Sequence, residues 1–398
     1  MKKINNIINK LKEKNIFFYL FMLIFIGLYI KRLVTYEYIN TYTLSYYRIT
    51  YTLGFLSRAL VGSIFDILGI ITKTEICIFI TFINFSFMII MSSFLNNLIK
   101  KYKNNLFILV ALLFIFNTAS ITNIYSFLEF GRLDIFICLA FIISMYLIYK
   151  DRLEFIPIIS LVTMLIHENF LMWCAPVICA LLLYKFIISK NKKYLYTLII
   201  NIIVLLILFI TTRFIILKPN YENAHILTNK IQEKSDFTIN EIAIRQYYYM
   251  TKEENHTTFN IPFSNQNILD WLVAAVGFIF LFTILSVLCF YPLLKKSKHK
   301  FFFIILILSC FTPIILYFRV SDFGRWYVYI INNLLILSYY LFITNKELLD
   351  TKQNNKILFL YIFIYLIFSC YFYPNKNFDI IEYNHTDKLL EMRDTNGK

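Results

Sequence analysis

Long apolar segments separated by short basic loops constrain this chain more than any motif does. Apolar residues make up 59% of its 398 positions, charged residues make up 16%, and the mean hydropathy is +0.65. A soluble core of this size could not bury so much apolar surface. The sequence therefore predicts an all-α, polytopic transmembrane helical bundle.

Eleven segments of the chain are apolar enough to be predicted as membrane spans, which need about 20 residues to cross ~30 Å of hydrocarbon. With a cytoplasmic N-terminus, the lysine-rich loops all fall on the inner side, as the positive-inside rule requires. We predict one integral-membrane domain, 1–398, with outward loops at 31–74 and 217–268. The predicted spans are 16–30, 75–95, 106–125, 133–149, 155–166, 170–187, 195–216, 269–291, 301–317, 327–343 and 357–373.

The charge and the cysteines exclude several classes of protein. The net charge is +15, but the excess lysines stand at the ends of the apolar segments, so we expect no nucleic-acid partner. All seven cysteines lie inside apolar segments without C-x-x-C spacing. This argues against a disulfide framework and against a thiolate metal site. No cofactor is expected, and the sequence leaves a divalent metal open.

The arginines are distributed differently from the lysines. By the predicted topology, only Arg152 of the ten arginines lies on the inner side. A lysine is sufficient to hold a loop in the cytoplasm, whereas the planar, forked guanidinium is suited to binding carboxylates and phosphates. The outward face is therefore predicted to be the working face.

The turn His167-Glu168-Asn169 lies between two unusually short predicted spans. Two crossings within 155–187 allow only ~25 Å for each helix, so we expect the turn to be recessed beneath the outer surface. The alternative is that the bilayer thins locally around short helices. A recessed His167 with Glu168 beside it suits general acid/base chemistry. The plainer interpretation of His167 is a structural histidine.

Two further outward clusters contain arginine close to acidic residues. The first holds Arg58 and Asp66, in a segment that we expect to form amphipathic or re-entrant helices with an apolar stripe of Leu56, Leu60, Ile64 and Leu68. The second, Glu129 to Asp134, places Arg132 at a predicted helix N-terminus, where the helix dipole disfavours a cation. Interfacial anchoring and helix capping, respectively, are the plainer explanations of these clusters.

The last outward cluster is the most densely charged turn of the chain. It contains Arg319, Asp322, Arg325 and Trp326 within eight residues. An aromatic belt at the membrane surface explains Trp326, but not two arginines on the side where positive charge is not needed for topology. We expect phosphate or carboxylate binding here.

The arrangement of these residues resembles the EpsG/Wzy-type membrane polymerases of bacterial polysaccharide assembly. The resemblance rests on Arg132 opening one outward hairpin, on His167-Glu168-Asn169-Phe170 at the next, on Pro176 after it, and on Arg325 in a later outward turn. It implies a bacterial plasma-membrane glycosyltransferase that joins polyprenyl-pyrophosphate-linked oligosaccharides at the outer face of the membrane. Its implied partners are this lipid-linked substrate, the bilayer and other polysaccharide-assembly proteins.

The resemblance also implies roles for the residues of the outward clusters. His167 is the predicted base, and Glu168 is second to it. Asp134 and Asp322 would orient arginines or sugar hydroxyls. The pyrophosphate would be bound by Arg132 and Arg325, with Arg58 and Arg319 in weaker roles, and Trp326 would belong to the substrate-binding set.

Two alternative functions remain open from the sequence. A transferase of the GT-C type, with a polyprenyl-phosphate sugar as donor, would use a carboxylate of the first outward loop, so that Glu37 or Asp66 would matter most. A flippase or another transporter would be expected to carry polar or broken helices at mid-membrane and internal repeats. The charged clusters lie at one face instead, which favours an enzyme.

Overall fold

The computed structural model describes residues 15–35, 39–53, 58–101, 120, 130–211, 224–241, 243–244, 276, 278–318 and 323–345. These residues form helices and turns, and no strand occurs among them. The all-α prediction is thereby confirmed for this part of the chain. Among the described residues, four helices are long and apolar enough to cross a membrane, namely Lys73–Asn97, Lys192–Ile210, Phe278–Lys296 and Arg325–Thr344. The chain is a helical membrane protein, and its eleven spans and their orientation stay predictions.

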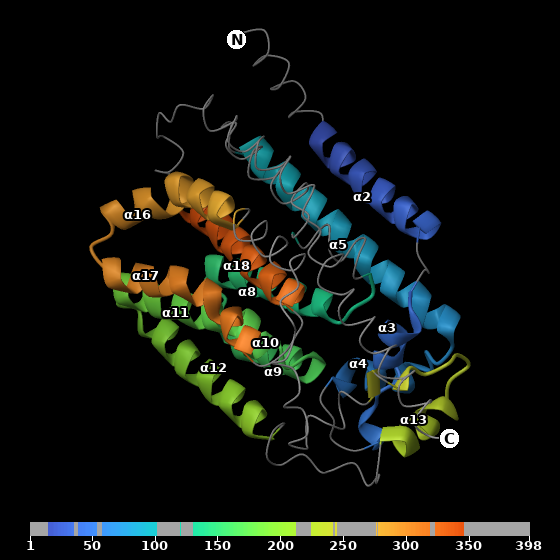
Figure 1. The fold of residues 1–398 in the computed structure, drawn as a ribbon. Coiled ribbons are helices and arrows are strands. Elements are labelled where there is room, and N and C mark those ends of the chain that lie inside the picture. The colour runs from blue at the N-terminus through green and yellow to red at the C-terminus, as the bar shows by residue number, and fades with distance from the viewer. Residues whose placement is uncertain are drawn as a thin grey trace. The chain divides into compact units, whose positions relative to one another are not determined.

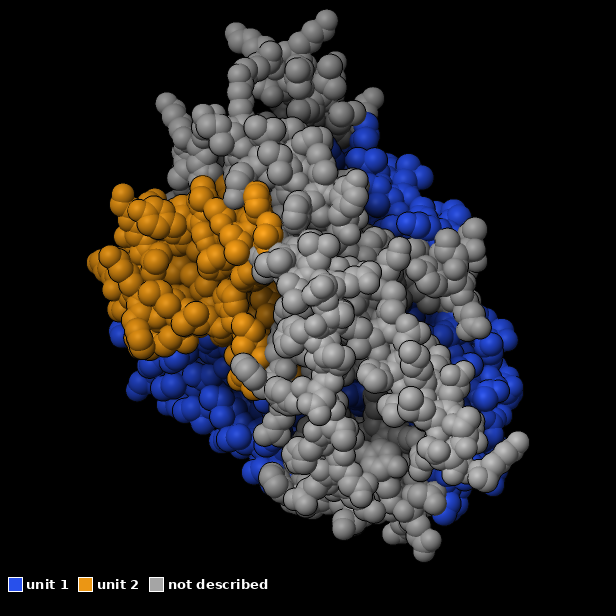
Figure 2. Space-filling view, in the orientation of Figure 1, with its two compact units in different colours: residues 1–108, 124–256 blue, residues 109–123, 257–398 orange. Residues whose placement is uncertain are grey.

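The chain divides into two compact units (Figure 2), and the description as one domain stays a prediction. The helices of the first unit are α2 (Ile16–Thr35), α3 (Thr41–Tyr46), η1 (Tyr51–Leu53), α4 (Ala59–Leu68), α5 (Lys73–Lys101), α8 (Asp134–Tyr149), η3 (Leu153–Phe155), α9 (Ile156–Ile166), α10 (Phe170–Trp173), α11 (Ala175–Ser189), α12 (Lys192–Ile210) and α13 (Ala224–Gln232). The second unit contains η6 (Ser286–Phe290), α16 (Tyr291–Lys296), α17 (Lys300–Leu308), η7 (Ser309–Phe318) and α18 (Phe323–Thr344).

Within each unit, helices pack both on their neighbours in the sequence and on helices farther along the chain. In the first unit α2 lies along α5, and α9, α11 and α12 form a layer in which α12 contacts both of the others (Figure 1). Helix α8 packs on α9 and α11. In the second unit α18 packs against η7, which also contacts α17. The predicted spans at 106–125 and 357–373 lie outside the described residues.

The predicted span 170–187 is not one continuous helix. Helix α10 ends at Trp173, and α11 begins at Ala175 after a break at Cys174. Pro176 explains the break, because proline lacks a backbone N–H and its ring clashes with the carbonyl group four residues earlier. Helix α9 has 11 residues and is about 17 Å long, so this part of the chain is built from short helices, as the sequence predicted.

The first outward loop of the prediction contains the short helices α3 and α4. On α4 the stripe predicted from the sequence is exposed, since Ile64 and Leu68 are 44% and 63% exposed. The opposite side of α4, with Ala59 and Phe65, is buried. Both helices belong to an apolar cluster that also includes Ile76 and Ile80 of α5 and side chains of 227–244. On α4 the predicted stripe is therefore the open side, and the side with Ala59 and Phe65 is the packed side. Leu56 lies outside the described residues.

Helix α5 begins at a capping box. The backbone N–H of Thr72 donates to Oε2 of Glu75 over 2.9 Å, and the backbone N–H of Glu75 donates to the hydroxyl of Thr72 over 3.3 Å. The backbone N–H of Lys73 is bound by Asp236, at a distance of 2.8 Å. Asp236 follows α13, so this contact fixes the start of α5 to the segment after α13.

Gly62 allows α4 to approach the backbone that follows α3. A Cβ atom at position 62 would lie 2.1 Å from the carbonyl oxygen of Ile49 and 3.0 Å from that of Tyr47. Both are backbone atoms, which cannot move aside as the end of a flexible side chain can. The contact between α4 and the segment 47–49 therefore requires glycine.

We expect Gly62→Ala to lower the free energy of unfolding by roughly 2 kcal/mol or more, because forced overlap in a packed region typically costs ~1–3 kcal/mol. The measurement is the unfolding midpoint of the purified protein in detergent. Gly27→Ala on α2 is the control, since nothing lies within 4 Å of a Cβ atom at position 27. Equal midpoints for the two variants would contradict the close approach.

Candidate functional site

The strongest polar contact of the first unit joins α4 to the turn before α10. Nε of Arg58 donates to Oε1 and Oε2 of Glu168, each at 3.0 Å, and Nη2 of Arg58 also contacts Oε1. The side chains are 7% and 15% exposed. A forked guanidinium bound to a carboxylate in this way is among the strongest hydrogen-bonded pairs in proteins. The Arg58 guanidinium therefore fixes Glu168.

The backbone of Arg58 adopts an unusual conformation. Its φ and ψ angles are 62° and 11°, in the left-handed region, and it stands directly before the first residue of α4. This region normally suits glycine and is unfavourable for other residues by about 1 kcal/mol or more. The conformation places the Arg58 side chain against the ring of Tyr46, 5.6 Å from the ring centre, as well as against Glu168.

His167 ends α9 and lies beside Glu168. The imidazole is buried, and its Nδ1 is 3.5 Å from Oε2 of Glu168 and 3.2 Å from the backbone nitrogen of Asn169. A proton on Nδ1 would be donated to the carboxylate, which leaves the lone pair of Nε2 available as a base. A proton on Nε2 would instead let Nδ1 accept from the Asn169 N–H. The two contacts require opposite tautomers, since the bond from the Asn169 N–H needs an unprotonated Nδ1 and a bond to Glu168 needs a proton on it.

The charges around the turn set the protonation of both side chains. Burial and the neighbouring Arg58 guanidinium lower the pKa of His167, and their effect exceeds that of the nearby carboxylates of Glu168 and Asp134, which raise it. Burial alone would raise the pKa of Glu168, but the charges of Arg58 and His167 and their hydrogen bonds hold it well below its usual range. At neutral pH the pair is a neutral imidazole beside a carboxylate.

The Phe130–Asp134 turn brings two more of the predicted residues into this unit. Asp134 is the first residue of α8, is 1% exposed, and acts electrostatically on His167 and Tyr47. Arg132 is half-buried, and its guanidinium lies 5.9 Å from the ring centre of Tyr42. The unit therefore gathers Arg58, Asp134, His167 and Glu168 in one interacting cluster, and it brings Arg132 to the start of α8.

The tyrosines of α3 are the part of this arrangement that the sequence analysis missed. Tyr42 and Tyr46 stand four residues apart on one face of the helix, with ring centres 5.1 Å apart, and their rings contact Arg132 and Arg58 respectively. Tyr47 donates from its hydroxyl to the carbonyl oxygen of Gly131 over 2.6 Å. The i, i+4 spacing of two tyrosines at 42 and 46 was the available signal, once the polar segment 41–46 is taken as helix.

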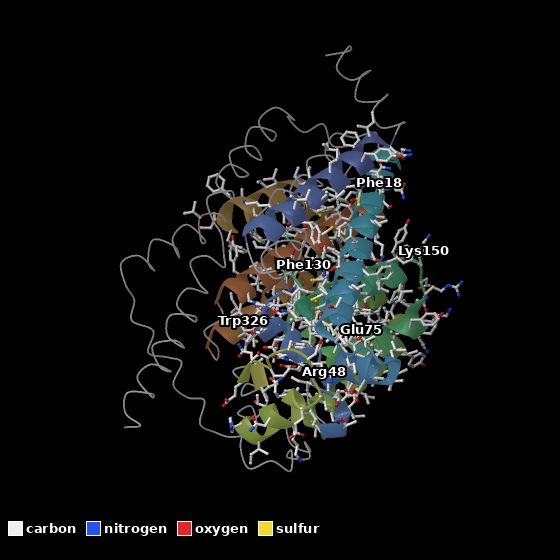
Figure 3. All side chains as sticks on the ribbon, turned by 90° about the vertical axis from the view of Figure 1, so that its right-hand side faces the viewer. Phe18, Arg48, Glu75, Phe130, Lys150 and Trp326 are labelled. Atoms are coloured by element: carbon white, nitrogen blue, oxygen red, sulfur yellow. The ribbon has the colours of Figure 1, made fainter. Side chains whose placement is uncertain are left out.

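Arg48 is a second missed residue. It is 4% exposed and donates from Nε to the Ser235 hydroxyl over 3.2 Å and from Nη2 to the carbonyl oxygen of Lys234. Its Nη1 lies 4.0 Å from Oδ1 of Asp66. In Figure 3 Arg48 lies close to α13, in agreement with these bonds. Arg48 therefore holds the segment after α13 against the segment that follows α3.

The remaining predicted residues lie just before α18 or in its first turn. Arg319 and Asp322 are outside the described residues. Arg325 and Trp326 belong to α18 in the second unit, where the Arg325 guanidinium lies 5.7 Å from the ring centres of both Trp326 and Tyr329. Trp326 is 3% exposed, and Figure 3 shows its position on the ribbon. Its side chain is thus packed within the second unit.

The described part of the chain contains no obvious metal-binding site. No three His, Cys, Asp or Glu side chains there are arranged to hold an ion. In the charged cluster around His167, the Glu168 carboxylate that a metal ion would need as a ligand is paired with the Arg58 guanidinium.

Comparisons with protein families, with curated proteins and with solved structures gave no match to this chain.

The Arg58–Glu168 pair predicts a strongly non-additive pattern of stability. Arg58→Ala or Glu168→Gln alone should lower the free energy of unfolding by at most ~3–5 kcal/mol, because each leaves a buried group without its partner. The double variant should lose clearly less than the sum of the two. The measurement is denaturant unfolding in mixed micelles. Arg152→Ala is the control, since its pair with Glu154 is 4.0 Å long and exposed, where ~0–1 kcal/mol is expected. Simple additivity at 58 and 168 would contradict the coupling.

The lowered pKa of His167 predicts a loss of stability on acidification. Because the folded state holds this pKa below the unfolded value of ~6.5, the stabilisation is complete above about pH 6.5 and is lost as the pH falls through the folded pKa. The unfolding free energy of His167→Asn should therefore fall less steeply below pH 6.5 than that of the wild type. His225→Asn, which replaces an exposed imidazole, should follow the wild type. An unchanged slope in His167→Asn would contradict the assignment.

Proposed function

We propose that the protein is a membrane glycosyltransferase that polymerises polyprenyl-pyrophosphate-linked oligosaccharides at the outer face of a bacterial plasma membrane. The observation that carries the proposal is a buried Arg58–Glu168–His167 chain in the same unit as the half-buried Arg132. The Arg58–Glu168–His167 chain supplies an oriented, neutral imidazole, and Arg132 supplies a guanidinium for a phosphate. These are the two groups that transfer from a pyrophosphate donor to a sugar hydroxyl requires.

The proposed reaction assigns one step to each group. The lone pair of His167 Nε2 accepts the proton of the acceptor hydroxyl as its oxygen bonds to the anomeric carbon of the donor. The bond from this carbon to the pyrophosphate oxygen breaks, and the leaving group takes the electron pair. Arg132 binds the negative charge that forms on the pyrophosphate, and the imidazolium later releases its proton to solvent.

Glu168 and Arg58 have supporting roles in this mechanism. In the tautomer that the proposed reaction uses, Nδ1 of His167 carries the proton, and Glu168, 3.5 Å away, accepts it in a hydrogen bond that orients the ring and stabilises the imidazolium that forms. Arg58 keeps Glu168 ionised and in place, so its proposed role is to position a carboxylate, whereas the resemblance alone suggested phosphate binding. Because His167 is 1% exposed, acceptor entry requires the surrounding segments to move apart. Asp134 is buried near His167, so we assign it to the electrostatics of the imidazole.

The charged turn before α18 completes the proposal through the resemblance to EpsG/Wzy-type polymerases. Arg325 and Arg319 are proposed to bind a second phosphate or the second lipid-linked chain, with Asp322 orienting them and Trp326 supporting this turn. The packing of Arg325 on Trp326 and Tyr329 supports a positioned guanidinium. The partners that we propose are the lipid-linked oligosaccharide, the bilayer and other proteins of polysaccharide assembly.

The GT-C alternative has one observation in its favour. Asp66, the carboxylate that this alternative would use in the first outward loop, is 30% exposed in its side chain and lies 4.0 Å from Arg48. It is therefore open enough to meet a substrate, whereas Asp134 is not. Glu37, its other candidate, lies outside the described residues.

Alanine variants at 167, 325 and 66 separate these functions in the host. For a polymerase, His167→Ala and Arg325→Ala should shorten the surface glycan to single repeats, because loss of a general base costs ~10²–10⁴-fold in rate. Arg152→Ala, at an exposed ion pair, should leave the chain length unchanged. The readout is the length distribution of the glycan by gel electrophoresis. Loss only in Asp66→Ala would support the GT-C alternative, and full-length polymer in all three variants would refute the enzymatic site.

A further inference from the structure

Helix α3 contacts Arg58 and Arg132 through its tyrosine rings. The Arg132 guanidinium carbon lies 5.9 Å from the centre of the Tyr42 ring, and that of Arg58 lies 5.6 Å from the centre of the Tyr46 ring. The two rings meet edge to face at 84°, with 5.1 Å between their centres. A guanidinium over an aromatic face is attracted by the ring quadrupole and loses freedom of movement.

The backbone contacts of α3 fix its position relative to the Arg132 turn. The Tyr47 hydroxyl donates to the Gly131 carbonyl oxygen over 2.6 Å. Gly131 has a φ angle of +92°, and a Cβ atom there would lie 3.3 Å from a methyl carbon of Thr43 and 3.4 Å from one of Ile39. The residue before Arg132 is therefore held directly against the N-terminal end of α3.

Arg58 and Arg132 differ in how far they are buried. Arg58 is 6% exposed, and its guanidinium is bound to Glu168. Arg132 and Tyr42 are both half-buried, so a ligand can reach them more readily. Tyr46 is 5% exposed, which makes its ring part of the interior. Tyr42 is thus the ring that borders the accessible guanidinium.

We propose that Tyr42 is a positioning residue that sets the affinity of Arg132 for a diphosphate anion, and that α3 fixes this anion site relative to the His167 base through Tyr46 and Arg58. A guanidinium held against a ring keeps its planar N–H edge directed at the anion and loses less freedom on binding. This inference rests on the proposed function in taking Arg132 as the anion-binding group.

Binding of inorganic pyrophosphate to the purified full chain tests the proposal without a glycan assay. The protein is placed in nanodiscs of zwitterionic lipid, and the Kd is measured by calorimetry at low salt without divalent metal. Arg132→Ala should abolish the binding of pyrophosphate. Tyr42→Leu should weaken it about 3- to 10-fold, whereas Tyr42→Phe should stay within about 2-fold, because phenylalanine keeps the aromatic face.

A shape-preserving series separates the ring electrostatics from the folding of α3. Phenylalanine with one, two or three ring fluorines at position 42 keeps nearly the same volume while the ring face becomes progressively less negative. The Kd should rise with each fluorine. This series carries the test even where Tyr42→Leu fails to fold. Tyr19→Leu on α2, where the tyrosine is 61% exposed, should not change the Kd.

The outcomes distinguish the inference from the function on which it rests. If Arg132→Ala abolishes binding while the Kd is flat across the fluorinated series, the role of Tyr42 is overturned and the anion role of Arg132 stands. If the wild type does not bind pyrophosphate, or if Arg132→Ala binds it as the wild type does, both the inference and the assignment of Arg132 fail. Binding that follows ring electrostatics and requires Arg132 supports the inference.

Discussion

The ion pair between Arg58 and Glu168 is the contact on which the arrangement of the first unit depends. Two charges taken out of water are stable only when each satisfies the other, and here the guanidinium binds both carboxylate oxygens. The pair joins the start of α4 to the turn between α9 and α10. His167 follows from it, because the carboxylate that Arg58 fixes is also the one that the imidazole contacts.

The same pair separates the roles of the two arginines in this unit. A guanidinium bound by a carboxylate has little left for a phosphate, so Arg58 contributes by keeping Glu168 ionised and the neighbouring imidazole neutral. Arg132 is half-buried and contacts the ring of Tyr42, and we propose that its guanidinium binds the anion. The unit therefore combines one arginine that organises the interior with one that is suited to a ligand.

The sequence predicted the class of this protein and part of its site, but not the contacts between the residues of the site. Apolar runs predicted the helices α2, α5, α8, α9, α12 and α18, because such runs must leave water whatever their partners are. The break at Cys174 was missed, although Pro176 signals it. His167, Glu168 and Asp134 were found by their chemistry. The pair of Glu168 with Arg58 was not, because it joins residues 110 positions apart. Arg48 and Tyr42 were also missed because their partners are distant in sequence.

The left-handed backbone conformation at Arg58 sets two requirements against each other at position 58. Glycine would relax the φ angle of 62°, yet it would also remove the group that neutralises Glu168. The backbone conformation thus favours glycine at position 58, whereas the ion pair with Glu168 requires arginine. The chain has arginine there. Asn15, Asp151 and Lys190 also have positive φ angles, so backbone geometry draws attention to position 58, and the ion pair with Glu168 explains why arginine stands there.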